Sequence, residues 1–227
     1  WAGIALALRA WRNAPEVLTT ILLNFVALHL LGWLVNGPMQ EKGGQYPQTD
    51  AVPAAGRLAT YGTTRLHAGL WLALAAAVIL YLFLFHSRIG LRLRAAGLNP
   101  FAARWAGVDV GRQIALAMLA SGAIAGIGGA VELLGVTHRL YERFATGAGY
   151  SGIAVALLAQ LHPLGAMAAA LFFGGLATGA GELQRSQGVS ASVAVMIQGV
   201  AVLFVIAASA GPFRALEGLR GLQRRRS

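Results

Sequence analysis

A chain of 227 residues that is 57% hydrophobic and only 11% charged, with several nearly uninterrupted apolar runs, is unsuited to a water-soluble domain and indicates an integral membrane protein of the helical class. Its net charge of +10 comes almost entirely from arginines at the ends of those runs and between them, so the charge indicates membrane topology and not nucleic-acid binding. The absence of cysteine excludes disulfides and thiolate metal sites.

The first part of the chain alternates between apolar and polar segments. Residues 1–8 are apolar but cover only about 12 Å, less than half of the hydrocarbon core, so we expect the severed end of a longer span, with residues missing upstream. Residues 17–36 are predicted to form the first complete span and residues 68–86 the second. Between them, residues 37–67 form a segment that is too long for a tight turn and too polar for the membrane.

The segment 87–112 holds five arginines and a single acid, Asp109, which is typical of a cytoplasmic loop. A short helix with marked ends is predicted inside it. Asn99 can cap its N-terminus, Pro100 suits the first helical position, and Gly107 suits the left-handed residue that closes the C-terminus.

This predicted helix has about two turns, which are not stable alone in water, so it needs something to pack against. Its small residues, Ala102, Ala103 and Ala106, form a face that would let another protein come close. The alternative is a capped turn that only joins two membrane helices.

The second half of the chain contains three long apolar segments and one short one. Residues 113–136 form the third span, in which Gly122 and Gly126 provide a small-residue face for helix contact. Residues 152–161 cover only about 15 Å before His162 and Pro163, which predicts a half-helix or a re-entrant segment. Residues 164–181 then cross or return, 182–190 form a short polar loop, and 191–210 form the last span.

The arginines set the predicted orientation. With the 87–112 loop inside, twelve basic residues are cytoplasmic (Arg9, Arg12, the five arginines of the loop and the five after residue 211), against six outside. This agrees with the positive-inside rule and places the C-terminus in the cytoplasm. We therefore expect a transmembrane domain over 1–210 and a basic cytoplasmic tail over 211–227.

Catalytic motifs are absent from the sequence. It has no zinc-protease, nucleophile-elbow or dinucleotide-binding pattern, and its single lysine, Lys42, is not in the context of a P-loop, so the chain does not hydrolyse ATP by a Walker mechanism. The few polar groups within the spans are candidates for a solute pathway: Asn24, Glu132 and Gln198. Each could instead form a structural hydrogen bond between helices. One intramembrane acid is too few for an ion pump or a proton-coupled carrier.

The basic loop resembles that of a known family. Its pattern G-x-N-P-x-A-A-x-x-x-G is similar to the coupling helix of ABC importer permeases of the ribose and nucleoside type, with matches at Gly97, Asn99, Pro100, Ala102, Ala103 and Gly107. Residues 16–24, 130–135, 149–158 and 162–165 resemble the nucleoside branch in particular.

The resemblance implies an all-α, polytopic transmembrane bundle of the vitamin B12-importer-like (type II) permease kind, here with about five full spans and a half or re-entrant helix. It implies a multi-pass protein of the bacterial inner membrane that works with ABC ATPase subunits, a second permease subunit and an extracytoplasmic solute-binding protein. ATP and Mg²⁺ would be held by the ATPase, and this chain would carry no cofactor and no enzyme activity.

We therefore expect the permease subunit of an ATP-driven nucleoside importer. The alternatives are a permease for ribose-like sugars, a passive channel or facilitator without an ATPase and, more distantly, a membrane-embedded enzyme, for which no set of nucleophile, base and metal ligands is found.

Overall fold

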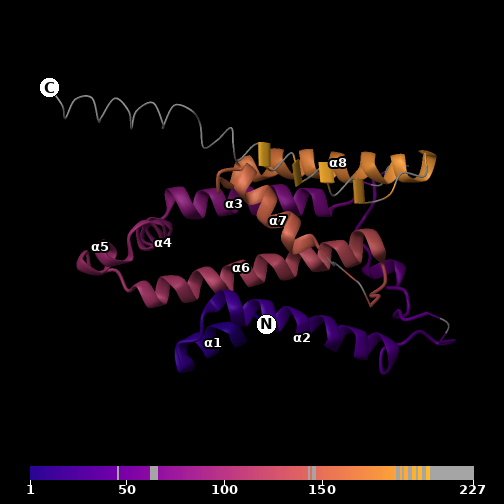
Figure 1. Ribbon diagram of the computed structural model, residues 1–227, viewed down its shortest axis with the longest axis horizontal. Helices are drawn as coiled ribbons and strands as arrows, with labels where there is room; N and C mark the ends of the chain where they lie inside the picture. Colours follow the sequence, from indigo (N-terminus) through magenta and orange to yellow (C-terminus); the bar gives the residue numbers. More distant parts are fainter. Residues whose placement is uncertain are drawn as a thin grey trace. The chain divides into compact units, whose positions relative to one another are not determined.

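The computed structural model describes residues 1–44, 46–61, 66–142, 144, 147–187, 190, 192, 193, 196, 197, 199, 200, 203 and 204. The chain divides into two compact units, Trp1–Thr146 and Gly147–Ser227, which are described separately. The first unit contains six α-helices among its described residues: α1 (Ala2–Arg12), α2 (Glu16–Asn36), α3 (Gly69–His86), α4 (Arg88–Leu98), α5 (Pro100–Trp105) and α6 (Val110–Glu132) (Figure 1). A 3₁₀ turn, Ala54–Gly56, and a π-helical turn, Leu133–Thr137, complete it.

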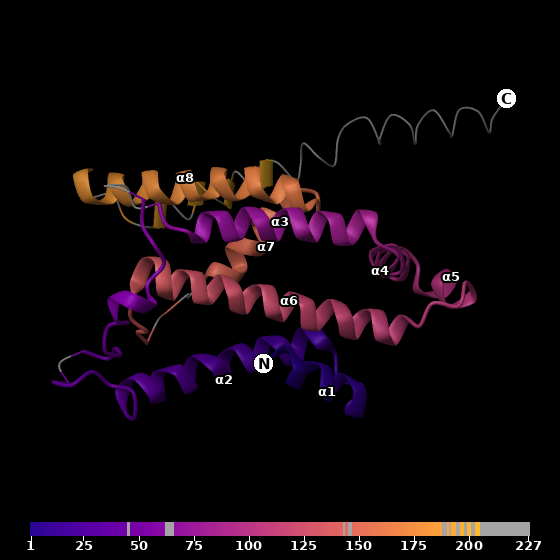
Figure 2. The same ribbon diagram turned by 180° about the vertical axis from the view of Figure 1, so that it is seen from behind.

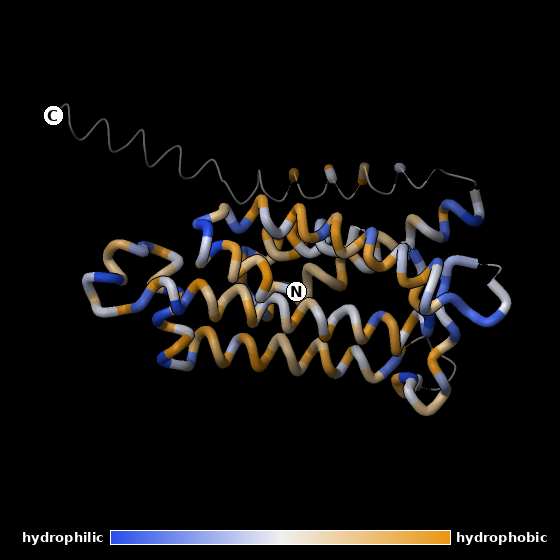
Figure 3. The backbone as a smooth tube through the Cα atoms, turned by 90° about the horizontal axis from the view of Figure 1, so that it is seen from below, coloured by the Kyte–Doolittle hydropathy of each residue, from blue (hydrophilic) through white to orange (hydrophobic). Residues whose placement is uncertain are grey.

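Four helices in the described part of the chain are long and apolar enough to cross a membrane: α2, α3, α6 with its π turn, and α8 (Pro163–Gln187) of the second unit. Figure 3 shows these helices coloured mostly as hydrophobic, with hydrophilic residues at the turns between elements. The prediction of a polytopic helical membrane protein is confirmed. The predicted last span, 191–210, lies largely outside the described residues, and the tail, 211–227, lies wholly outside them.

Helix α1 packs on α6 at a point where both helices carry small residues. A Cβ atom added at Gly122 would lie 2.5 Å from the Cβ of Ala2, so the two backbones approach too closely for a larger residue at Gly122. The close helix contact predicted for the small-residue face of the third span is thus confirmed at Gly122, whereas the Cβ position of Gly126 has no neighbour within 4 Å. Arg9 of α1 also forms an ion pair with Glu16 at the start of α2, at 2.5 Å.

A sharp corner joins α3 to α4, and Ser87 is its pivot. The Ser87 hydroxyl donates to the carbonyl oxygen of Phe83 at 2.6 Å and accepts from the amide of Gly90 at 2.9 Å, so one side chain bonds both helix ends. Any Cβ at Gly90 would overlap the carbonyl oxygen of Phe83 and lie 2.5 Å from that of Leu84. The absence of a side chain at Gly90 therefore makes the corner possible.

The region predicted as a loop between the second and third spans is thus mostly helical. Helix α4 occupies its residues Arg88–Leu98 and was not predicted from the sequence. Buried Ala96 of α4, Ala103 of α5 and Val110 of α6 form a small core, with Ala95, Val108 and Ile114 packed against it. This core gives the short α5 the packing partner that two turns require.

The second unit contains α7 (Ala148–Leu158) and α8. Helix α7 has eleven residues, too few to cross a bilayer, as predicted for the half or re-entrant segment, but it begins four residues before and ends three residues before the predicted bounds, 152–161. The chain reverses through Gln160 and Leu161, both in the left-handed region, before Pro163 begins α8. The prediction of a loop over 182–190 is wrong in its first part, because α8 continues to Gln187 through residues with good helix propensity.

Candidate functional site

The capped helix α5 has the end geometry that the sequence predicted. The side-chain oxygen of Asn99 accepts from the amides of Phe101, at 3.1 Å, and Ala102, at 3.0 Å. Pro100 is the first helical residue, and Gly107 has a φ of +78°. These caps satisfy backbone groups that six helical residues cannot pair internally, and so stabilise both ends of α5.

The burial of α5 corrects the prediction about its contact face. Ala103 is only 4% exposed and belongs to the core shared with α4 and α6, so it is not available to a partner. Ala102 and Ala106 remain exposed. The expected row of three small contact residues is wrong at Ala103, because its methyl group is buried against Ala96 of α4 and Val110 of α6.

Two aromatic side chains project from the opposite side of α5. Phe101 is 69% exposed and Trp105 is 81% exposed, and their rings meet edge to face with centroids 6.1 Å apart. Their spacing of four residues places them on one face of the helix. Large aromatic residues with neighbouring arginine, here Arg104, are the side chains that most often anchor protein interfaces.

Helices α4 and α5 lie beyond the same end of α3 and α6 (Figure 2). The stretch 87–108 contains four arginines and no acid. Arg94 places its guanidinium over the ring of Phe85, 4.6 Å from the centroid, and so fixes α4 against the end of α3. This end of the first unit is therefore basic and aromatic.

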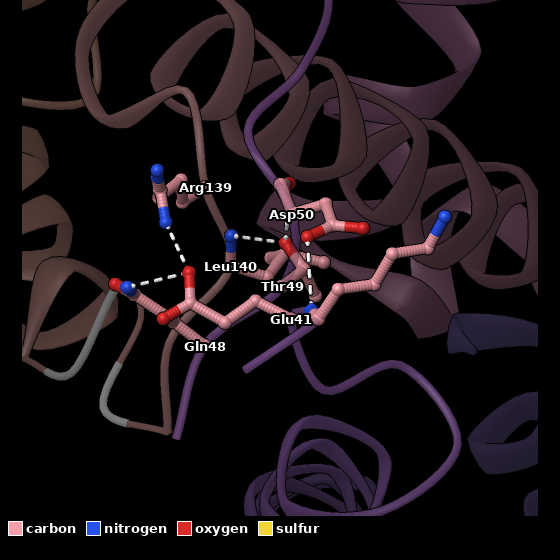
Figure 4. Close-up of polar contacts among 7 residues, drawn as sticks. Glu41, Gln48, Thr49, Asp50, Arg139 and Leu140 are labelled. Carbon is pink, nitrogen blue, oxygen red and sulfur yellow. Dashed lines mark hydrogen bonds and ion pairs between the residues drawn. The ribbon is translucent and has the colours of Figure 1, made fainter. Parts of the chain in front are cut away.

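At the other end of the first unit, polar contacts join the 37–68 segment to the chain after α6. Glu41 forms an ion pair with Arg139 and accepts from the Gln48 amide at 3.0 Å (Figure 4). The Thr49 backbone amide donates to the Leu140 oxygen at 2.9 Å, and the Leu140 amide donates to the Thr49 hydroxyl at 3.1 Å. We call these five residues the loop cluster.

The π turn after α6 supports the same junction. In a π turn, some carbonyl oxygens lack an ordinary helical partner. Here the Leu134 oxygen accepts from the Leu58 amide at 3.0 Å, and just beyond the turn the His138 oxygen accepts from the Val52 amide at 2.9 Å. Val52 and Leu58 of the 37–68 segment are thus hydrogen-bonded to the end of the third span.

The structure does not bring together the two candidate pathway residues that it describes, Asn24 and Glu132. Asn24 lies in the middle of α2 and Glu132 is the last residue of α6, both exposed on the isolated chain. Among the described residues, no hydrogen bond joins Asn24 to Glu132. Gln198 lies outside the described residues. Their role in a pathway stays a prediction.

Several residues that shape the two ends of the first unit were not singled out from the sequence. Ser87 followed by an arginine-rich apolar segment could have signalled the N-cap of α4. Gly90 carries no such signal, because its role depends on the angle between two helices. The pairing of Glu41 with Arg139, 98 residues apart, likewise has no local signature.

Comparison with known proteins gives a consistent result. The model of a family described as branched-chain amino acid transport system / permease component matches residues 1–206. The chain is 36% identical over 211 residues to the guanosine ABC transporter permease protein of Bacillus subtilis, covering 90% of this chain and 60% of that protein. It is 36% identical over 217 residues to a glucose ABC transporter permease protein of Haloferax volcanii, covering 91% and 57%.

A nucleoside ABC transporter permease protein of Lactococcus lactis is 30% identical over 208 residues, covering 87% of this chain and 57% of that protein. The chain therefore spans less than two thirds of the length of these curated relatives. No solved structure matches it.

Proposed function

The chain belongs to the branched-chain amino acid transport system / permease component family, and from this premise we propose that it is the transmembrane permease subunit of an ATP-driven importer that translocates nucleosides. The observation that carries the proposal is α5, a capped helix that presents Phe101 and Trp105 away from the chain's own core. Two of the relatives named above are permeases for guanosine or nucleosides, which supports the solute class.

The proposed architecture is the type II permease kind, with about five full spans and α7 as a half or re-entrant helix. The protein is placed in the bacterial inner membrane, with the arginine-rich end of α3, α4 and α5 and the C-terminus in the cytoplasm. The segment 37–68 and the loop cluster would then face the solute-binding protein. A second permease subunit, identical or paralogous, completes the pathway.

In this proposal, α5 moves as one rigid unit and so couples ATP binding to transport. ATP and Mg²⁺ bind to the partner ATPase, and its two subunits come together. The aromatic face of one α5 contacts each ATPase subunit and moves with that subunit. Because α5 shares a core with α4 and α6, its displacement is transmitted to α6, and through the corner at Ser87 to α3. Such a rigid-body shift can change the side to which the pathway opens.

The proposal is tested by ATP hydrolysis in liposomes containing the full-length permease, its neighbouring ATPase and its binding protein. Stimulation by nucleosides and not by ribose or glucose supports the nucleoside importer. Stimulation by sugars alone favours the sugar permease, which the glucose relative keeps as the second candidate. If no ATPase associates with the permease, the passive facilitator becomes the better interpretation.

Two matched substitutions on α5, each introducing one negative charge, separate an effect on folding from an effect on ATPase binding. Ala103→Glu places a carboxylate in the buried core and should lower the stability of the folded protein by about 2 to 3 kcal/mol. Ala102→Glu is exposed, so it should leave the thermal unfolding midpoint in detergent nearly unchanged but weaken ATPase binding. Equal unfolding midpoints for the two variants would contradict the burial of Ala103.

Glu132 is the candidate pathway residue with a direct test. The substitution Glu132→Gln removes the charge and keeps the shape of the side chain, so it should lower nucleoside uptake by about tenfold if the charge serves the pathway. The amount of permease in the membrane, measured by immunoblotting, should change much less. Equal losses of uptake and abundance would assign Glu132 a structural role.

A further inference from the structure

Helix α4 lies across the spans and not along them. In Figures 1 and 2 it is seen nearly end-on, whereas α3 and α6 run across the picture. Only Ser87 separates its first residue, Arg88, from the last residue of α3, His86. Since α3 is long enough to cross the membrane, a helix that turns aside directly at its end lies at the depth of the lipid headgroups.

The exposed side of α4 has two adjacent rows of different chemistry. Arg88 and Arg92, four residues apart, form one exposed row. Leu91 and Leu98, seven residues apart and 60% and 88% exposed, form the other. A basic row beside an apolar row is the pattern of a helix that rests in a membrane interface.

The charge of this side has no counterpart within the protein. No acid occurs in residues 87–108. In the described part of the chain, neither Arg88 nor Arg92 takes part in an ion pair. Arg94, by contrast, is packed over Phe85 and is turned to the protein. Two exposed guanidinium groups at headgroup depth are placed to bind phosphate oxygens, for which arginine has the matching geometry.

We propose that the exposed side of α4 binds anionic phospholipid in the cytoplasmic leaflet, with Arg88 and Arg92 on the headgroup phosphates and Leu91 and Leu98 against the acyl chains. The ATPase is the less favoured occupant, because α5 lies farther out from the spans than α4 in both views and carries the aromatic anchor. Lipid bound at α4 would hold the start of the coupling unit in place while α5 moves.

The proposal takes the membrane orientation from the proposed function but does not depend on the solute, so it is tested without ATPase or binding protein. Full-length permease is purified in detergent, and its binding of phosphatidylglycerol and phosphatidylcholine is compared by native mass spectrometry. We expect preferential binding of phosphatidylglycerol. The double variant Arg88→Gln/Arg92→Gln should lower that affinity about thirtyfold, or roughly fivefold for each arginine.

Two control variants make the result specific. Arg88→Lys/Arg92→Lys keeps the charge and should retain most of the binding, and Arg104→Gln, an exposed arginine of α5, should leave it unchanged. If the double Gln variant does not fold, the parent protein must still lose phosphatidylglycerol as salt is raised. Equal affinity for the two lipids, equal affinity of parent and double Gln variant, or full competition by inorganic phosphate would each overturn the proposal. In a separate co-purification experiment with the ATPase, a double Gln variant that loses ATPase binding but keeps its phosphatidylglycerol binding would assign this side of α4 to the ATPase.

Discussion

Replacing both Phe101 and Trp105 with alanine should abolish nucleoside-stimulated ATP hydrolysis by the reconstituted importer while leaving the permease folded. These rings are 69% and 81% exposed, so removing them costs the isolated chain little packing. In the proposed complex they pack against the ATPase, and a central aromatic side chain in such an interface contributes about 2 to 4 kcal/mol to the binding free energy. Losing two of them should weaken ATPase binding at least about a hundredfold.

The matched control for this variant is Trp11→Ala. Trp11 lies on α1, is 85% exposed and has no place in the proposed ATPase contact. Its substitution should leave ATPase binding, measured by co-purification with increasing ATPase concentration, within about twofold of the parent. Full ATPase stimulation in the Phe101 and Trp105 double variant would mean that α5 does not anchor the ATPase.

A single methyl group at Gly90 should disrupt the corner between α3 and α4. Its carbon would overlap the Phe83 carbonyl oxygen and would lie 2.5 Å from the Leu84 carbonyl oxygen. Because both obstacles are backbone atoms, no side-chain rotation can relieve the clash, and α4 must move. We expect Gly90→Ala to lower the stability of the folded permease by roughly 3 kcal/mol or more and to impair ATPase coupling.

Gly97 provides the internal comparison for this substitution. It lies on the same helix with open space around its Cβ position, so Gly97→Ala should be neutral or slightly stabilising because it reduces the entropy of the unfolded chain. Thermal unfolding of the two variants in detergent measures the difference. A Gly90→Ala protein as stable as Gly97→Ala would show that the corner is not as tight as described.

The ends of α5 could be predicted from local sequence, but the direction of its faces could not. Its caps depend on residues adjacent in the chain, and Asn99, Pro100 and Gly107 predicted them correctly. Its orientation was predicted with the alanines outward, and this proved wrong at Ala103. The small alanine is buried in the core shared with α4 and α6, whereas the larger Phe101 and Trp105 are exposed on the opposite side of α5.

By itself the sequence determined the membrane class, the four spans that the structure describes and the ends of α5. These depend on the composition of contiguous runs and on backbone hydrogen bonds within a few residues. Only the tertiary structure decided the turn at Gly90, the buried position of Ala103 and the pairing of Glu41 with Arg139. Each of these depends on how closely segments distant in the chain approach one another. Within apolar spans, hydrophobicity alone does not specify which faces meet, because every face is apolar.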